Sequence, residues 1–233
     1  MITLYNGPIP QTVIGCRIKT LCDCYKDIHN TVDLYTDGTA VICRFENTLL
    51  ATENCDISQL VSFAEVLGIA EIELEGENAL QVDRWYSVSH PVLYRDCSGD
   101  DEVSLLSSLK ECFDIIAVSN EDFAKNANYL YWLSDINRRQ NRCCAKTYCQ
   151  NGAVATVSAI TESSAYLSSV AVCPESRNQG RASQLLKLIC SDKMLSGKRI
   201  YTAAQNEAVA KLYLKNGFFP LEKSVITLKR SKF

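Results

Sequence analysis

The chain has 233 residues, of which 47% are hydrophobic, enough to bury a core in one large or two small domains. The formal net charge is −3, so the chain lacks the overall basic field of a nucleic-acid-binding protein. No apolar run is long enough to span a bilayer, and residues 1–15 lack the basic start and apolar core of a signal peptide. We therefore expect a cytoplasmic protein with no membrane partner.

The first half is predicted to mix strands and helices. Val32–Tyr35 and Thr39–Arg44 are β-favouring runs on either side of Asp37-Gly38, which is a strong hairpin signal. A capping pattern that begins at Asp56 predicts a helix that stops at Gly68. The other predicted elements are strands at Thr48–Thr52, Ile69–Leu74 and Trp85–Tyr94, and a helix capped by Asp100 or Asp101 that carries Leu105, Leu106 and Leu109.

A domain boundary is predicted near the middle of the chain. Ser98–Asp101 is the most polar break in this region, so we divide the chain into a smaller mixed α/β domain at residues 1–112 and a second domain at residues 113–233. The alternative is that the first half extends one continuous sheet.

The second half begins with a predicted buried strand at Phe113–Val118. A capping pattern at Ser119 then predicts a helical region, made of one helix or two, that runs to Arg138 and Arg139. Arginines at the end of this region complement the helix dipole, and the alternative is a contact with phosphate or with an acidic substrate. The strands predicted after it are Cys143–Cys149, Ala153–Thr161, Tyr166–Val172, Arg199–Ala203 and Val225–Leu228, with a hairpin signal at Asn151-Gly152.

The cysteines and histidines do not form a metal-binding pattern. The sequence contains 12 cysteines but no Cys-x-x-Cys pair, and its two histidines are isolated. Because a structural zinc site uses paired ligands at short spacing, we expect no metal. Many cysteines have apolar neighbours, so we expect reduced, buried side chains. The alternative is a redox role for the close pairs Cys22/Cys24 and Cys143/Cys144.

A phosphate-binding turn is indicated where a β-favouring run ends at Val172 and a helical pattern begins after Gly180. The start of a helix leaves backbone N–H groups without partners and carries a partial positive charge. Small residues such as Gly180 and Ala182 let a phosphate approach those groups. No P-loop lysine follows, so the turn is not typical of a nucleoside triphosphate site.

A second segment, Asn206–Phe218, reads as a short amphipathic helix. Asn206 is a suitable N-cap, and Gly217 stands where a helix needs a left-handed C-terminal residue. Taken alone, the segment indicates only that Tyr213 packs in a core. Its position after the phosphate turn and one short strand makes the combination more specific.

Together the two segments resemble the GCN5-related N-acetyltransferase (GNAT) superfamily. Arg177–Ala182 fits the family motif Gln/Arg-x-x-Gly-x-Gly/Ala, and Asn206–Phe218 is similar to the family's Asn…Ala…Leu-Tyr…Gly-Phe helix. The resemblance covers about residues 113–233 and implies a GNAT fold there, with acetyl-CoA as cosubstrate. The order strands, helix, strand in the first half resembles part of the same fold without the cofactor motif.

The resemblance also implies roles for individual residues. The diverging strand end would bind the pantetheine arm, the turn would bind the pyrophosphate, and Asn206 would hold the cofactor beyond the next strand. A backbone N–H near Val172 would stabilise the oxyanion, and Tyr213 would protonate the CoA thiolate as general acid. The implied cofactor-binding residues are Val170, Ala171, Val172, Arg177, Asn178, Gln179, Gly180, Arg181, Ala182, Ser183, Asn206 and Tyr213.

The general base is not fixed by the resemblance. Where protein-modifying relatives carry a glutamate on the fourth strand, Tyr166 stands in this chain. Glu162 is the nearest carboxylate and is our candidate for the catalytic base, and a chain of water molecules is the alternative.

The function that the resemblance implies is transfer of an acetyl group from acetyl-CoA to a primary amine of a small molecule or a peptide. We expect no nucleic-acid partner, and the oligomeric state stays open, with a homodimer among the options. One alternative is a non-catalytic acyl-CoA-binding or regulatory module. The other is a FemX-like aminoacyl transferase, which the acidic charge of the chain disfavours.

Overall fold

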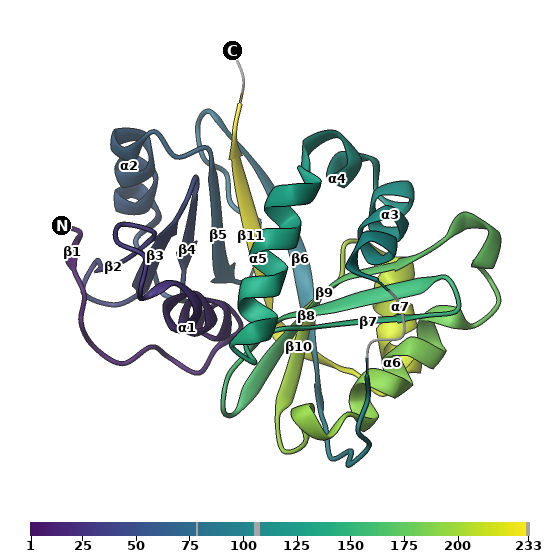
Figure 1. Cartoon of the computed structure of the whole chain (residues 1–233). Coiled ribbons are helices and arrows are strands. Elements are labelled where there is room, and N and C mark those ends of the chain that lie inside the picture. The colour runs from purple at the N-terminus through teal and green to yellow at the C-terminus, as the bar shows by residue number, and fades with distance from the viewer. Residues whose placement is uncertain (78, 105–107, 232–233) are drawn as a thin grey trace. The chain divides into compact units, whose positions relative to one another are not determined.

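The computed structural model describes residues 1–77, 79–104 and 108–231, and it has the mixed α/β architecture that the sequence predicts (Figure 1). The chain forms two compact units. The first unit consists of Met1–Leu93, Ala203–Ala210 and Pro220–Phe233, and the second unit consists of Tyr94–Thr202 and Lys211–Phe219.

The sheet of the first unit has the strand order β1, β2, β3, β4, β5, β11, β6. Its strands are β1 (Thr3–Leu4), β2 (Val32–Thr36), β3 (Val41–Phe45), β4 (Thr48–Ala51), β5 (Glu71–Gly76), β11 (Phe219–Arg230) and β6 (Trp85–Asp96). Helix α1 (Val13–Tyr25) contacts one face of the sheet and α2 (Ile57–Leu67) the other. Successive side chains of β5 point to opposite faces of the sheet, which explains this arrangement. Glu73 forms a hydrogen bond with Arg17 of α1, whereas Ile72 and Leu74 pack against α2.

Local signals located most elements of this unit correctly. The hairpin at Asp37-Gly38 is confirmed by the antiparallel pairing of β2 with β3. The predicted helix is also confirmed, since Asp56 caps α2 and Gly68 ends it with a φ of 69°. Helix α1 is not among the elements predicted from the sequence, although Thr12 caps it by accepting a hydrogen bond from the N–H of Gly15.

The C-terminal strand, β11, lies between β5 and β6 in the sheet, far from its place in the sequence. β11 pairs antiparallel with β5, from Ser224↔Gly76 to Lys229↔Glu71, so most of β11 belongs to the first unit. The compact units therefore differ at this strand from the predicted domains 1–112 and 113–233, and the division into domains stays a prediction.

The sheet of the second unit has the strand order β10, β9, β8, β7. Its strands are β7 (Lys146–Gln150), β8 (Ala153–Ile160), β9 (Ser164–Val172) and β10 (Arg199–Ala203), of which Ala203 belongs to the first unit. The other elements are α3 (Leu109–Ser119), α4 (Glu121–Asn126), α5 (Tyr129–Asn141), η1 (Pro174–Ser176), α6 (Arg181–Ser191), η2 (Lys193–Leu195) and α7 (Glu207–Lys215), and α7 belongs to this unit from Lys211 on. Cys149 packs against α3, whereas the adjacent Tyr148 bonds to Asp192 at the end of α6, so α3 and α6 cover opposite faces. The hairpin predicted at Asn151-Gly152 is confirmed.

The strand predicted at Phe113–Val118 is wrong, because these residues form most of α3. The buried side chains of α3 are Cys112, Ile115 and Ile116, whose spacing is helical, and the short apolar run concealed this period. The predicted caps at Asp100 or Asp101 are also wrong, because Ser108 caps α3. The predicted helix residues Leu105 and Leu106 lie outside the described residues.

One smaller difference concerns the start of a helix, because Asn120, and not Ser119, caps α4. Asn128 caps α5, so the helical region contains two helices, which is one of the two arrangements expected from the sequence. Most of the cysteines are buried, as expected for small hydrophobic side chains. Within the described residues, no helix is long and apolar enough to cross a membrane.

A buried carboxyl group in the first unit leads to a prediction about pH. Glu75 is 3% exposed and accepts a hydrogen bond from the N–H of Ile14 in the first turn of α1. Burial raises the pKa of Glu75 above its ordinary value of 4.5. The stability that this group contributes is therefore full below about pH 4.5 and is lost as the pH rises through the folded-state pKa. We expect Glu75→Gln to reduce that loss, as measured by urea denaturation at pH values from acidic to neutral.

The matched control is Glu73→Gln on the same strand. Burial of Glu73 favours its neutral form, but the Arg17 guanidinium overcomes this effect and lowers the pKa of Glu73. Its contribution to stability is present at neutral pH and is lost on acidification, so this variant should destabilise the protein most at neutral pH. If both variants gave the same pH dependence of the free energy of unfolding, this account of Glu75 would be wrong.

Candidate functional site

Strands β9 and β10 pair only over their first residues. Their parallel register runs from Ser164↔Arg199 to Leu167↔Thr202. On its other side β9 stays paired with β8 as far as Val172↔Ala153. Within the described residues of the second unit, the edge of β9 that faced β10 therefore lacks a strand partner after Leu167.

A β-bulge lies at the start of this unpaired edge. Ser168 pairs with Thr156 and Ala171 pairs with Val154, so two β9 residues stand opposite Ala155 alone. One of these two, Ser169, has a φ of 51°. A bulge bends its strand and increases the local twist, which accounts for the separation of β9 from β10. No sequence pattern predicts this bulge, because an extra residue inside a regular strand leaves no local turn signal.

The predicted pantetheine-binding residues Val170, Ala171 and Val172 form the separated end of β9. The carbonyl oxygen of Val172 already accepts two hydrogen bonds, from the Ser119 hydroxyl at 3.0 Å and from Nε of Arg177 at 3.2 Å. The Arg177 side chain is therefore anchored to the strand end, immediately before the predicted phosphate turn.

The predicted phosphate turn ends at Gly180, which is the N-cap of α6. Gly180 has a φ of 74°, and no side chain from the described part of the chain caps the helix there. The N–H groups of Arg181, Ala182 and Ser183 lie in the first helical turn, where intrahelical partners do not exist. A Cβ built on Gly180 would meet nothing within 4 Å among the described residues other than its chain neighbours, so the space on this side of the turn is open. The turn therefore fits a phosphate group.

The side chains of the turn are held by one another. Gln179 Nε2 donates to the carbonyl of Glu175 at 2.9 Å. The guanidinium of Arg181 donates to Gln184 Oε1 at 3.3 Å and to Gln179 Oε1 at 3.5 Å, and within the described residues its buried Nε has no partner. Asn178, with a φ of 59°, supplies a second left-handed residue that folds the turn.

Helix α2 of the first unit provides a contrast, because it too follows a strand and leads to a parallel neighbour. Its first N–H groups are occupied by the Asp56 carboxylate, which accepts from Ser58 at 3.0 Å and from Gln59 at 3.1 Å. Hydrogen bonds from Gln59 and Ser58 lower the pKa of Asp56 to about 2, so it is charged at neutral pH. An anion at this helix would meet a carboxylate in place of free donors.

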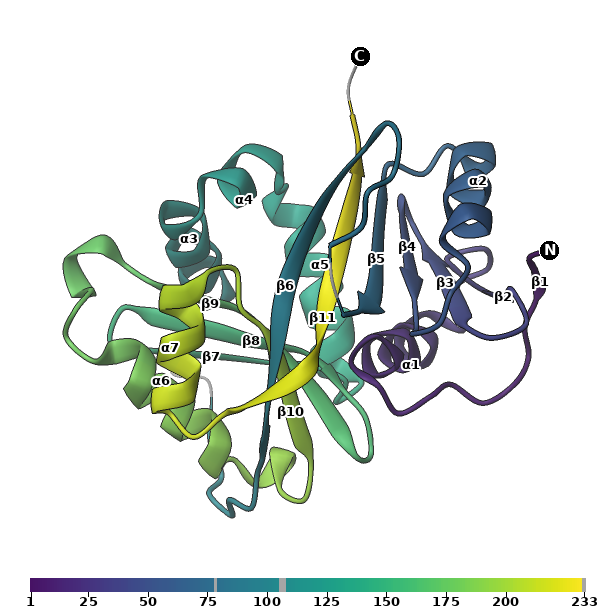
Figure 2. The ribbon, with the colours of Figure 1, turned by 180° about the vertical axis from the view of Figure 1, so that it is seen from behind.

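The helix that carries the remaining predicted residues is α7. As predicted, Asn206 caps it, because Asn206 Oδ1 accepts a hydrogen bond from the N–H of Val209 at 3.0 Å. Gly217 follows the end of the helix with a φ of 79°, also as predicted. Figure 2 shows α7, which belongs to the second unit from Lys211 on, beside α6.

Tyr213 lies at the point where β9 and β10 separate. Its side chain is 3% exposed, and its ring packs against Phe218 with a centroid distance of 5.2 Å. Its hydroxyl forms a hydrogen bond with Thr202, the last β10 residue that pairs with β9. Burial raises the pKa of Tyr213, and the bond to Thr202 only partly opposes this effect. The phenol is therefore protonated at neutral pH.

Glu162, the predicted base, lies far from this place. It is exposed in the turn between β8 and β9, and its carbonyl accepts a hydrogen bond from Lys198 Nζ at 2.7 Å. Because a strand rises about 3.3 Å per residue, roughly 16 Å of chain separates Glu162 from Leu167, where β9 and β10 separate, and roughly 30 Å separates it from the end of β9. The structure does not bring this carboxylate to the phosphate turn.

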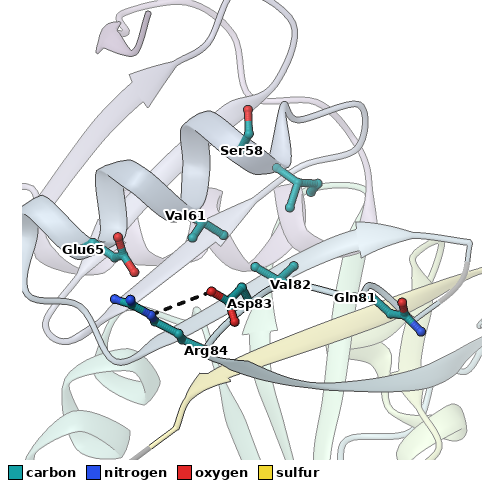
Figure 3. A pocket seen from close by; sticks show the side chains of 8 residues that line it. Ser58, Val61, Glu65, Gln81, Val82, Asp83 and Arg84 are labelled. Atoms are coloured by element: carbon teal, nitrogen blue, oxygen red, sulfur yellow. Dashed lines mark ion pairs between the residues drawn. The ribbon is translucent and has the colours of Figure 1, made fainter.

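The predicted residues are also separate from a cavity of about 540 Å³ in the first unit (Figure 3). Its wall comes from α2 and from residues 81–84, and includes an ion pair between Asp83 and Arg84 at 3.8 Å. None of the predicted site residues lines it. Across the described residues, no group of three or more His, Cys, Asp or Glu side chains is arranged to hold a metal ion.

Comparison with known families identifies the segment that contains the turn. Residues 140–220 match a family model described as an acetyltransferase (GNAT) domain. This range begins near the end of α5 and continues through α7, so it includes Gly180, Asn206 and Tyr213. No curated protein matches the chain by sequence.

Solved structures share the fold over nearly the whole chain. A GCN5-related N-acetyltransferase from Kribbella flavida is 10% identical, with a TM-score of 0.57, 93% of this chain covered and 96% of that one. A putative GNAT-family acetyltransferase from Novosphingobium aromaticivorans is 16% identical, with a TM-score of 0.54 and coverage of 97% and 100%. A tandem GNAT protein from the clavulanic acid biosynthesis pathway is 10% identical, with a TM-score of 0.53 and 100% of both chains covered. At these identities the likeness concerns the fold.

Proposed function

We propose, from the premise that residues 140–220 of this chain match a GNAT acetyltransferase domain, that the protein transfers an acetyl group from acetyl-CoA to a primary amine. The observation that carries this proposal is the separation of β9 from β10 directly before an uncapped helix start at Gly180. A strand edge with unpaired backbone groups followed by free N–H donors suits an elongated ligand that ends in a diphosphate.

In this proposal the chain's own residues perform two tasks. The N–H groups of Arg181, Ala182 and Ser183 bind the diphosphate, with charge added by the guanidinium groups near the turn. Tyr213, protonated because burial raises its pKa, donates its proton to the sulfur that leaves. When bound, acetyl-CoA supplies an activated acyl group as a thioester.

The proposed reaction balances without a redox partner. The carbon–sulfur bond of the thioester breaks, a carbon–nitrogen bond to the amine forms, and the products are an N-acetylated acceptor and CoA with a free thiol. The amine loses one proton to water and solvent returns one proton to Tyr213, so the reaction releases no net proton and the acid is restored. The proposed acceptor is a small-molecule or peptide amine, and the proposed location is the cytoplasm.

A non-catalytic acyl-CoA-binding module is the main alternative, and Tyr213 argues against it because binding alone does not require a phenol where the strands separate. The test incubates the purified protein with acetyl-CoA and a panel of small-molecule amines, peptides and lysine derivatives, and measures the thiol released. Amine-dependent release is expected. Binding of CoA without release by any amine would favour the non-catalytic module, and binding of charged tRNA with a steep salt dependence would favour an aminoacyl transferase.

The stoichiometry of CoA binding gives a separate prediction. Because Asp56 occupies the first N–H groups of α2 whereas α6 has no side-chain cap, we expect a single CoA molecule per chain in isothermal titration calorimetry. The single site should disappear on substitution in the α6 turn and survive Asp56→Ala. Two equivalent CoA sites per chain would contradict this interpretation of the Asp56 cap.

A further inference from the structure

A buried amide connects the phosphate turn with the helix that carries Tyr213. Asn216 follows the end of α7 and is 7% exposed. Its side-chain Nδ2 donates to Ser183 Oγ at 3.0 Å and to the carbonyl oxygen of Leu212 at 2.8 Å. The backbone carbonyl of Asn216 accepts a hydrogen bond from the guanidinium of Arg95, which holds this end of α7 from a second side.

The contact between Asn216 and Leu212 determines which group donates in the hydrogen bond between Asn216 and Ser183. A backbone carbonyl can only accept, so the atom that faces Leu212 must be the amide nitrogen. The same nitrogen faces Ser183 Oγ, so the hydroxyl of Ser183 accepts in this pair. A hydroxyl that accepts keeps its own proton available for a different partner.

The position of Ser183 defines what that partner would be. Ser183 is the third residue of α6, so its hydroxyl belongs to the same first turn as the free N–H groups. The positive end of the helix dipole favours an anion there. A hydroxyl whose oxygen is already held by an amide donor is a good donor to an anionic oxygen.

We propose that Asn216 is a positioning residue for the diphosphate of CoA, a proposal that rests on the proposed function. By donating to Ser183 it turns the hydroxyl proton of Ser183 toward the anion at the start of α6. By donating to Leu212 it also fixes the residue that precedes Tyr213. One side chain therefore links the helix that binds the diphosphate to the helix that carries the proposed acid.

The test is a double-mutant cycle on CoA affinity, with Ser183→Ala, Asn216→Ala and the double variant measured by calorimetry. Loss of one hydrogen bond to a charged group predicts about 10-fold to 100-fold weaker CoA binding in each single variant. Because Asn216 acts through Ser183, the double variant should bind no more weakly than Ser183→Ala. Pantetheine, which lacks the diphosphate, should bind all variants equally. Asn128→Ala, which removes a side-chain cap from α5 in the same unit, is the matched control and should leave CoA affinity unchanged.

Asn216→Asp keeps the size of the side chain and serves if Asn216→Ala does not fold. Its carboxylate cannot donate, so Ser183 would donate to it and lose the proton meant for the diphosphate. Asn216→Asp should therefore weaken CoA binding. In the Ser183→Ala background, most of the difference in CoA affinity between Asn216 and Asn216→Asp should disappear. Fully additive losses, or wild-type affinity in the folded Asn216 variants, would overturn the role of Asn216. A wild-type protein that binds no CoA would overturn the proposed function, and the role of Asn216 with it.

Discussion

Changing Tyr213 to phenylalanine is expected to lower kcat for amine acetylation by about 10²–10⁴-fold, with little change in the KM for acetyl-CoA. The substitution removes only the hydroxyl, and the ring can still pack against Phe218. A proton given to the departing sulfur stabilises the transition state and not the bound substrate, so the loss falls on kcat. Single-turnover measurement of thiol release, with circular dichroism to verify folding, checks this.

The matched control for this variant is Tyr148→Phe. The Tyr148 side chain is 2% exposed, and its hydroxyl donates a hydrogen bond to Asp192 at 2.8 Å. The substitution to phenylalanine therefore also removes a buried hydrogen bond. It lies in β7, three strands from β10, so its loss should affect stability and leave kcat unchanged. An equal fall of kcat in both variants would indicate a general effect of buried hydroxyl loss. An unchanged kcat in Tyr213→Phe would exclude Tyr213 as the acid.

The elements that could be predicted from the sequence are those with strong local signals. The pairs Asp37-Gly38 and Asn151-Gly152 mark real hairpins, because their residues tolerate left-handed backbone: Asn151 has a φ of 52° and Gly152 of 74°. The turn before α6 could be placed for the same reason, since Gly180 at positive φ and the helical spacing after it are both local features.

Other elements depend on contacts that the local sequence does not contain. A short apolar run such as residues 113–118 is compatible with a strand or a helix. The helical conformation of α3 is selected by its packing against Cys149 and Val154, which the local sequence does not contain. The pairing of β11 with β5 joins segments far apart in the chain, so no periodicity could have indicated it.

The candidate site shows the same division between local and distant contacts. Gly180, Asn206 and Tyr213 belong to recognisable local motifs, and the structure places each at a helix start or on a helix as expected. The bulge at Ser169 and the bond between Ser183 and Asn216 arise only when strands and helices assemble. Glu162 stays an untested candidate for the base, and its place in the turn before β9 leaves about five residues of strand between it and the point where β9 and β10 separate.

The open space beside Gly180 leads to the last prediction, that Gly180→Ala weakens CoA binding by about 10-fold to 100-fold. No described atom lies within 4 Å of the added Cβ, so the methyl group would not clash inside the protein. It would stand where a phosphate must approach the N–H groups of α6, and one or two charge-assisted hydrogen bonds would be lost. Calorimetry with CoA measures the effect, and pantetheine affinity should not change.

Gly197→Ala separates this effect from backbone strain. Gly197 has a φ of 72°, close to the 74° of Gly180, and an added Cβ there also meets nothing within 4 Å of the described atoms. Both variants should therefore lose about 1–2 kcal/mol of stability, because a Cβ disfavours left-handed backbone. Gly197 lies between η2 and β10, away from the start of α6, so only Gly180→Ala should lose CoA affinity. Equal affinities in the two variants would mean that the diphosphate does not bind at the N-terminus of α6.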